Sequence, residues 1–175
     1  LFYDPILSLD NTISCASCHP QAHAFSDPRP FSVGVEGRTG FFPEQKRNAP
    51  ALFNLMYHDF LFWDGRIDDP FRTLDHLENQ VRLPIEDPIV MGNSVSVVME
   101  RLNNHEQYPD LFFQAFNDTI TELRIMQAIA SFERILLSYN SKYDRFVEAG
   151  FDSTVLTESE YKGFKLFFDE VPGKK

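Results

Sequence analysis

The chain has 175 residues with 26 acidic and 16 basic side chains, so its formal net charge is −10 at pH 7. This charge argues against nucleic acid or an anionic membrane surface as the main partner. No stretch approaches the roughly 20 apolar residues that span a bilayer. Eighteen phenylalanines within 43% hydrophobic residues suffice for a packed core, so we expect one domain, or one domain and part of another.

The first informative segment is Cys15-Ala16-Ser17-Cys18-His19, which contains both cysteines of the chain. This spacing is the attachment signature of a c-type haem. Each thiol can form a thioether with a haem vinyl group, and the histidine can place an imidazole nitrogen on the iron. We therefore predict one covalent haem c bound by Cys15, Cys18 and His19, with His19 as the iron ligand.

Other uses of this cysteine pair fit the sequence less well. A disulfide would close too short a loop to stabilise much, and a structural zinc ion needs four ligands, although no second CxxC is present. A thioredoxin-like motif should follow a buried strand. The residues before Cys15 are too few and too polar to form one.

Residues 23–49 contain several prolines and glycines, so we expect a long irregular segment that wraps a haem edge. The second half of the chain is predicted to be helical. Helical spacing indicates a helix at 94–103 with Ser94 as its N-cap, and another at 108–116. No strand pattern of comparable strength is present.

Three further helices are expected toward the end of the chain. The strongest pattern covers 119–139, where Thr119 and Glu122 have the spacing of a capping box. A helix at 141–149 is expected to end at Gly150. Thr157 and Glu160 predict the start of the last helix.

Two stretches, Arg47-Asn48-Ala49-Pro50 and Phe62-Trp63-Asp64-Gly65-Arg66, are specific enough to suggest a family. Further matching segments lie at 1–8, 13–19, 24–27, 80–92 and 130–134. Together they resemble the bacterial di-haem cytochrome c peroxidases and their MauG-like relatives over essentially the whole chain.

The resemblance implies an all-α, cytochrome c-like domain with long irregular haem-wrapping loops. Members of the family have two such domains, and this chain corresponds to the N-terminal one, whose haem meets peroxide. We accordingly expect a haem domain at 1–156. Residues 157–175 resemble the start of the connection to a second haem domain, which is absent from this chain.

The resemblance also suggests roles for five other residues. Gln80 matches a distal glutamine that can hydrogen-bond peroxide, and Trp63 matches a tryptophan between the two haems, although a lone tryptophan is often a core residue. Asn48 matches a calcium ligand at the domain junction, a site that needs more oxygen ligands than one asparagine supplies. Arg47 and Arg66 are candidates to bind haem propionates, or are solvated surface arginines.

Two positions depart from the family pattern. Val35 stands where many members carry a distal histidine ligand, so the iron is either five-coordinate or bound by another residue. Val90 stands ten residues after Gln80, where the family has its acid–base glutamate. A valine cannot transfer a proton, and whether the nearby Glu86 or Asp87 reaches the distal pocket cannot be read from the sequence.

The leading hypothesis is a periplasmic domain that reduces hydrogen peroxide with electrons from a small cytochrome c or a cupredoxin. The location follows from covalent haem attachment, which normally takes place outside the cytoplasm. MauG-like oxidation of another protein is a variant of this hypothesis, and a homodimer is also considered. The rival is a non-catalytic electron-transfer or sensing cytochrome, which Val90 favours. A third alternative is a chain produced without its haem.

Overall fold

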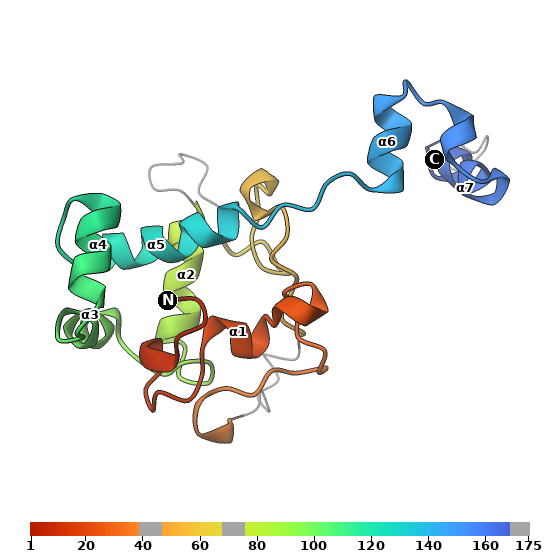
Figure 1. Ribbon diagram of the computed structural model, residues 1–175. Coiled ribbons are helices and arrows are strands. Elements are labelled where there is room, and N and C mark those ends of the chain that lie inside the picture. Colours follow the sequence, from red (N-terminus) through yellow and green to blue (C-terminus); the bar gives the residue numbers. More distant parts are fainter. Residues whose placement is uncertain (39–46, 68–75, 169–175) are drawn as a thin grey trace. The chain divides into compact units, whose positions relative to one another are not determined.

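The computed structural model describes residues 1–38, 47–67 and 76–168 (Figure 1). Within these ranges the regular structure is helical, with one isolated bridge between Leu61 and Ile67, which confirms the all-α prediction. The α-helices are α1 (Cys15–Cys18), α2 (His76–Glu86), α3 (Val95–Asn103), α4 (Tyr108–Phe116), α5 (Glu122–Arg134), α6 (Lys142–Glu148) and α7 (Glu158–Phe168). Short 3₁₀ turns lie at Pro5–Leu7, Gln21–His23, Val35–Gly37, Leu55–Tyr57 and Ser153–Val155.

The chain forms two compact units, Leu1–Leu137 and Ser138–Lys175. Within the second unit α6 packs against α7, where the ring centroids of Phe146 and Phe164 lie 5.0 Å apart. The haem-domain boundary expected after Leu156 stays a prediction. Whether residues 157–175 lead into a second haem domain stays a prediction.

The first unit is built on the pairing of α2 with α5, which has the most extensive contact between any two described elements (Figure 1). Leu77, Val81 and Ile85 of α2 are buried, as are Ile125 and Ile129 of α5. An ion pair joins the same helices, since Arg134 binds both carboxylate oxygens of the buried Glu78 at 2.6 and 2.8 Å. The helix pair forms a firm wall for the cavities described below.

The N-terminal segment is attached to α3 by one arginine. The guanidinium of Arg101 donates to the carbonyl oxygens of Ile6, Ser8 and Leu9 at 3.2, 2.6 and 2.8 Å. Three backbone acceptors of this segment are thereby satisfied by one side chain. These hydrogen bonds hold the segment that precedes α1 in the sequence against α3.

Local capping patterns predicted most helix starts correctly. Ser94 accepts from the Val97 amide, Ser141 accepts from Asp144, and Thr157 accepts from Glu160, so α3, α6 and α7 begin where expected. Gly150 lies just beyond α6 in the left-handed region, as expected.

The predicted helix at 119–139 is wrong at both ends. Thr121, rather than Thr119, is the N-cap and accepts from the Arg124 amide at 3.2 Å. The helix ends at Arg134, and the carbonyl of Leu136 instead accepts from the amide of Asn54 at 2.9 Å. A long-range hydrogen bond has replaced the last predicted turn.

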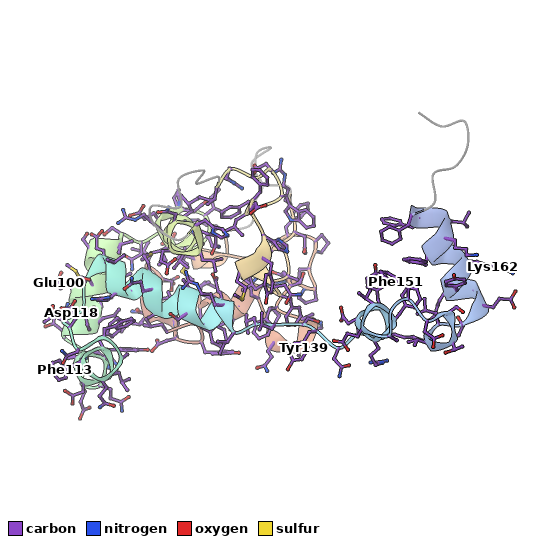
Figure 2. The ribbon with its side chains drawn as sticks, turned by 90° about the horizontal axis from the view of Figure 1, so that it is seen from above. Glu100, Phe113, Asp118, Tyr139, Phe151 and Lys162 are labelled. Carbon is purple, nitrogen blue, oxygen red and sulfur yellow. The ribbon has the colours of Figure 1, made fainter. Side chains whose placement is uncertain are left out.

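The second unit has an aromatic core of its own. Phe146 is fully buried and lies 5.0 Å from Phe164 and 5.4 Å from Phe151 between ring centroids. Phe151 points toward α6, whereas Lys162 extends into solvent from α7 (Figure 2). Aromatic pairs at these centroid separations stabilise the unit in addition to the free energy gained by burying their surface.

Candidate functional site

Helix α1 places both cysteines on one turn, and His19 follows directly. The amide of His19 donates to the carbonyl of Cys15 at 2.9 Å, which continues the turn as far as the histidine. At the other end, the amide of Ser14 donates to the hydroxyl of Ser17 at 3.0 Å. The three residues predicted for haem attachment therefore come from one short, well-held segment.

These residues line two cavities that share part of their walls. The large cavity has a volume of about 510 Å³ and is lined by Cys18 and His19 together with α2 and the 47–66 segment. The small cavity, about 50 Å³, adds Cys15 and α5. Both include Gln80, Pro84 and Val90. The large cavity has the size of a cofactor site and a mostly apolar wall.

His19 is oriented by a hydrogen bond to the backbone. Its Nδ1 atom lies 2.9 Å from the carbonyl oxygen of Phe25. Ala24 and Phe25 both have left-handed backbone conformations, with φ of +56° and +54°, and these turn the chain back toward the imidazole. Burial lowers the pKa of His19, which favours the neutral ring. Nε2 is then the nitrogen left for a metal.

The two cysteines are free thiols with little tendency to ionise. Burial raises the pKa of Cys15 to about 12, with the nearby charge of Glu133 acting in the same direction, and burial also raises the pKa of Cys18. Reactive cysteines have lowered pKa values and form thiolates. A thioredoxin-like role is therefore disfavoured.

The loop after His19 is held by an ion pair between a buried carboxylate and a partly exposed guanidinium. Asp27, whose side chain is completely buried, accepts from Nε and Nη2 of Arg29 at 2.8 and 2.7 Å. The same guanidinium donates to the carbonyl of Ser17 at 3.0 Å. This links the loop to α1 and closes one side of the site. Residues 39–46 of the predicted irregular segment lie outside the described residues.

Asn48 connects this loop to the 47–66 segment. Its Nδ2 donates to the carbonyls of Asp27 and Arg29 at 2.8 and 2.6 Å, and its Oδ1 accepts from Ser26 at 3.3 Å. The amide therefore has a structural role within this unit. Among the described residues, no group of three or more His, Cys, Asp or Glu side chains could hold a metal ion, and calcium binding stays a prediction.

Trp63, Arg47 and Arg66 lie together along the large cavity. Trp63 is 65% exposed, so it is not a core residue, and its Nε1 donates to the carbonyl of Asn48 at 2.8 Å. Both arginines bind Asp64, at 2.8 Å from Arg47 and 3.2 Å from Arg66. Loss of hydration would raise the pKa of Asp64, but these arginines outweigh that effect and lower it.

Val35 and Val90, the two departures from the family pattern, have different surroundings. Val90 lines both cavities, so the position that the resemblance assigns to an acid–base glutamate does face the site. Val35 is completely buried, and its amide donates to the carbonyl of Val90 at 2.9 Å. The preceding Gly34 is needed because a Cβ there would lie 1.8 Å from the carbonyl oxygen of Ile89.

Comparison with known proteins identifies the family. A family model described as di-haem cytochrome c peroxidase matches residues 1–151. The chain belongs to this family. It is 36% identical over 171 residues to the methylamine utilization protein MauG of Methylophilus methylotrophus, covering 97% of this chain and 47% of that protein. It is 34% identical over 170 residues to the cytochrome c peroxidase Ccp of Escherichia coli, covering 97% of this chain and 34% of Ccp.

Solved structures agree with this assignment. A MauG-like protein associated with microbial copper homeostasis superposes with a TM-score of 0.77 at 35% identity, over 96% of this chain and 46% of that one. The di-haem peroxidase BthA from Burkholderia thailandensis E264 superposes with a TM-score of 0.72 at 26% identity, over 96% of this chain and 44% of BthA. The chain thus spans about half the length, or less, of these relatives.

The site of this di-haem peroxidase-family chain fits the haem c of its family. Two thiols one turn apart, a histidine whose Nδ1 is held by a backbone carbonyl, and an apolar cavity of cofactor size are the features that covalent haem requires. A further sign is the buried Oε1 of Gln80, which has no hydrogen-bond partner among the described residues. An unpaired buried acceptor of this kind indicates a missing ligand or water.

Other acidic residues near the site differ in their surroundings. Glu86 and Asp87 line the large cavity, so they do reach it; Glu86 is exposed and lies 3.5 Å from Arg82, while Asp87 accepts from the amide of Ile89. Glu133 was not predicted as a site residue, yet it is buried and lines the small cavity. Its position continues the apolar face of Ile125 and Ile129 at helical spacing, which is a signal that could have found it.

Proposed function

We propose that this chain is the peroxide-facing haem c domain of a di-haem peroxidase-like protein and reduces hydrogen peroxide. The observation that supports this most strongly is that Cys18, His19 and Gln80 line one cavity of cofactor size. The cavity combines covalent attachment, an iron ligand and a side chain able to hydrogen-bond peroxide.

The haem, when bound, would supply the iron that accepts peroxide and the electrons that reduce it. Cys15 and Cys18 would hold it covalently, and His19 would bind the iron through Nε2. Arg47 and Arg66 are suited to bind propionates because a guanidinium pairs with a carboxylate through two hydrogen bonds. Gln80 would orient peroxide or water by its amide.

Electrons are proposed to reach this haem from a second haem domain, which is supplied in turn by a small cytochrome c or a cupredoxin. Trp63, exposed beside the large cavity, is proposed to lie on this route. Asn48 is proposed to contribute to a calcium site at the domain junction, and a homodimer is proposed as the assembly.

We place the protein in the periplasm, because covalent haem attachment takes place outside the cytoplasm. None of the described helices is long and apolar enough to cross a bilayer.

A non-catalytic electron-transfer or sensing cytochrome domain is the second candidate. It is favoured by Val90, which puts an apolar side chain on the cavity wall where proton transfer is needed. Oxidation of a protein substrate is a variant of the first candidate, because the matched relatives include MauG proteins.

The test uses the chain produced with a cytochrome c maturation system. Intact mass should show one covalent haem, and a mass without it would show that the chain carries none. Peroxide should then change the Soret absorption and oxidise a reduced small cytochrome when the second domain is present, and Gln80→Leu should slow this reaction. A low-spin, six-coordinate haem that ignores peroxide would contradict the enzymatic proposal and favour the second candidate.

A further inference from the structure

Helix α5 carries a buried carboxyl group, that of Glu133, near its C-terminal end. Glu133 is 4% exposed, and its Oε2 has no hydrogen-bond partner among the described residues. Burying such a group without a partner is costly, so an unpaired carboxyl oxygen in a native core calls for an explanation.

The charged and titratable groups around Glu133 compensate its charge only in part. Arg134 follows it on α5 but directs Nη2 to both oxygens of Glu78 on α2. Glu78 is itself an acid, and the other titratable neighbour is Cys15 on α1. Burial raises the pKa of Glu133 to about 8, the Arg134 charge opposing this and the Glu78 charge adding to it. Burial therefore favours the neutral carboxylic acid, which can both donate and accept a hydrogen bond.

The small cavity brings Glu133 together with the second unsatisfied group. Glu133 and Gln80 both line it, and the Oε1 of Gln80 is also without a partner. A volume of about 50 Å³ is large enough for water. The wall is mostly apolar, and Glu133 and Gln80 contribute the unsatisfied polar atoms that a buried water would bind. Gln80 and Val90 line the large cavity as well, so the small cavity borders the proposed peroxide site.

Of the side chains at this border, Glu133 has the right chemistry to handle protons. Val90 has no titratable group, and the Gln80 amide does not exchange a proton with peroxide near neutral pH. Glu86 is exposed beside Arg82, and Asp87 already accepts from a backbone amide. Peroxide reduction requires a positioned group that moves a proton while the O–O bond breaks.

We propose that Glu133 and Gln80 hold a water between them and that Glu133 passes protons to and from peroxide through this water. The inference rests on the proposed peroxidase function. Glu133 acts through the water and is therefore a positioning and relay residue. Glu133 thereby supplies the titratable acid that Val90 cannot supply.

The relay has a simple balance. The carboxyl proton of Glu133 moves to the water, and a water proton moves to the far oxygen of peroxide. The haem, when bound, would supply the two electrons with which the O–O bond breaks, and the far oxygen would leave as water. The near oxygen would return its proton to Glu133, which restores the acid, and would then take up two protons from solvent to leave as the second water. The electron donor would replace the two electrons, so one peroxide, two electrons and two protons give two waters.

The experiment compares the haem-loaded protein with three variants, Glu133→Gln, Glu133→Gln with Val90→Glu, and Glu100→Gln. Glu100 is exposed on α3 and provides the matched control (Figure 2). The rate of the peroxide-dependent Soret change should fall about 100-fold in Glu133→Gln, the lower end for acid–base catalysis. The wild-type rate should decrease as pH rises through the titration of Glu133, and this limb should vanish in the variant. Val90→Glu should restore much of the rate.

A second readout does not depend on turnover. Infrared spectra of the wild-type haem protein should show a protonated carboxyl band at neutral pH that is absent in Glu133→Gln and shifted in Gln80→Leu. A crystal structure should show the water between Glu133 and Gln80. If peroxide reacts at the wild-type rate in Glu133→Gln with an unchanged pH profile, or if the band or the water is missing, the relay is overturned. If neither the wild-type protein nor any variant reacts with peroxide, but the carboxyl band and the water are present, the proposed peroxidase function is contradicted. The water held by Glu133 and Gln80 is then still supported.

Discussion

The Nδ1 atom of His19 is held 2.9 Å from the carbonyl oxygen of Phe25 by a turn in which two consecutive residues have positive φ. The acceptor is a backbone atom, so the geometry of the turn, and not a side chain, decides how the imidazole is oriented. A carbonyl acceptor on Nδ1 also fixes the tautomer that leaves Nε2 available to a metal.

Changing Ala24 tests this turn. Ala24→Val should destabilise the protein by about 1–2 kcal/mol, because a β-branched residue fits the left-handed region poorly. Denaturant unfolding measures the free energy, and resonance Raman of the haem protein reports the iron–histidine bond. Ala24→Gly, which tolerates φ of +56°, is the control and should preserve the spectrum. An unchanged iron–histidine signal in Ala24→Val would show that the turn does not orient the ring.

The Asp27–Arg29 pair predicts a pH dependence of stability. Loss of hydration alone would raise the pKa of Asp27, but its hydrogen bonds and the Arg29 charge outweigh this and hold it below 3.8. A lowered folded-state pKa stabilises the protein above the unfolded value, and this contribution disappears as pH falls through the folded value. Asp27→Asn should therefore be less stable than wild type at pH 6. The difference should shrink below about pH 4, and unfolding curves at both pH values measure it. A pH-independent difference would contradict this origin.

The buried pair between α2 and α5 predicts a non-additive mutant cycle. Arg134→Met should cost about 3 kcal/mol, because it leaves the charge of Glu78 buried without its partner. Glu78→Leu combined with Arg134→Met should cost less than Arg134→Met alone, because no uncompensated charge remains. Denaturant unfolding of the single and double variants gives the coupling energy. Additive costs would mean that the two groups do not stabilise each other.

Much of the fold could be predicted because its signals are local. The capping residues Ser94, Ser141 and Thr157 each act within three positions of themselves, and all three predictions were confirmed. The end of α5 could not be predicted this way. The carbonyl of Leu136 is taken by the amide of Asn54, some eighty positions earlier, and helical spacing contains no information about that bond.

The sequence patterns predict no helix over the span of α2, and Pro84 lies inside this helix. Proline has no amide hydrogen, so the carbonyl of Gln80 loses its helical donor, and a proline normally indicates a break. The helix persists because its buried face packs against α5. Packing against α5 therefore outweighs the local preference of proline against a helix. The residue that loses a backbone hydrogen bond is Gln80, which lines both cavities.

The site was predictable where chemistry depends on spacing and not where it depends on burial. Cys15, Cys18 and His19 followed from the CxxCH pattern, and the structure places them at one pair of cavities. Glu133 was not predicted as a site residue: its spacing from Ile125 and Ile129 indicates the core-facing side of the helix, but the unpaired Gln80 on α2 cannot be seen in the sequence. Asn48 was expected as a calcium ligand, and its contacts within the loop could not be anticipated.

The aromatic core of the second unit predicts a local effect. Phe146→Ala should weaken this unit by about 3–5 kcal/mol, because it leaves a cavity among Phe151, Tyr161 and Phe164. Hydrogen exchange should quicken in α6 and α7 and stay unchanged in α2 and α5. Phe167→Ala is the matched control, because this ring is 82% exposed. Quickened exchange throughout the chain would contradict the division into two units.

The acidity of Glu133 predicts a stability profile opposite in sign to that of Asp27. Its folded-state pKa is raised, mainly by burial, from 4.5 to about 8, so the folded protein holds a proton that the unfolded chain releases. Stability is therefore fully present below pH 4.5 and is lost as pH rises toward 8, by about 1.4 kcal/mol for each pH unit. Glu133→Gln removes the titrating group and should flatten the profile, so the variant should be more stable than wild type at pH 9. Denaturant unfolding of the haem-loaded proteins across pH 5–9 measures this, with Glu100→Gln as the control that should follow wild type. Parallel profiles for wild type and Glu133→Gln would mean that Glu133 is ionised in the folded protein, and a relay that starts from its neutral acid would then be excluded.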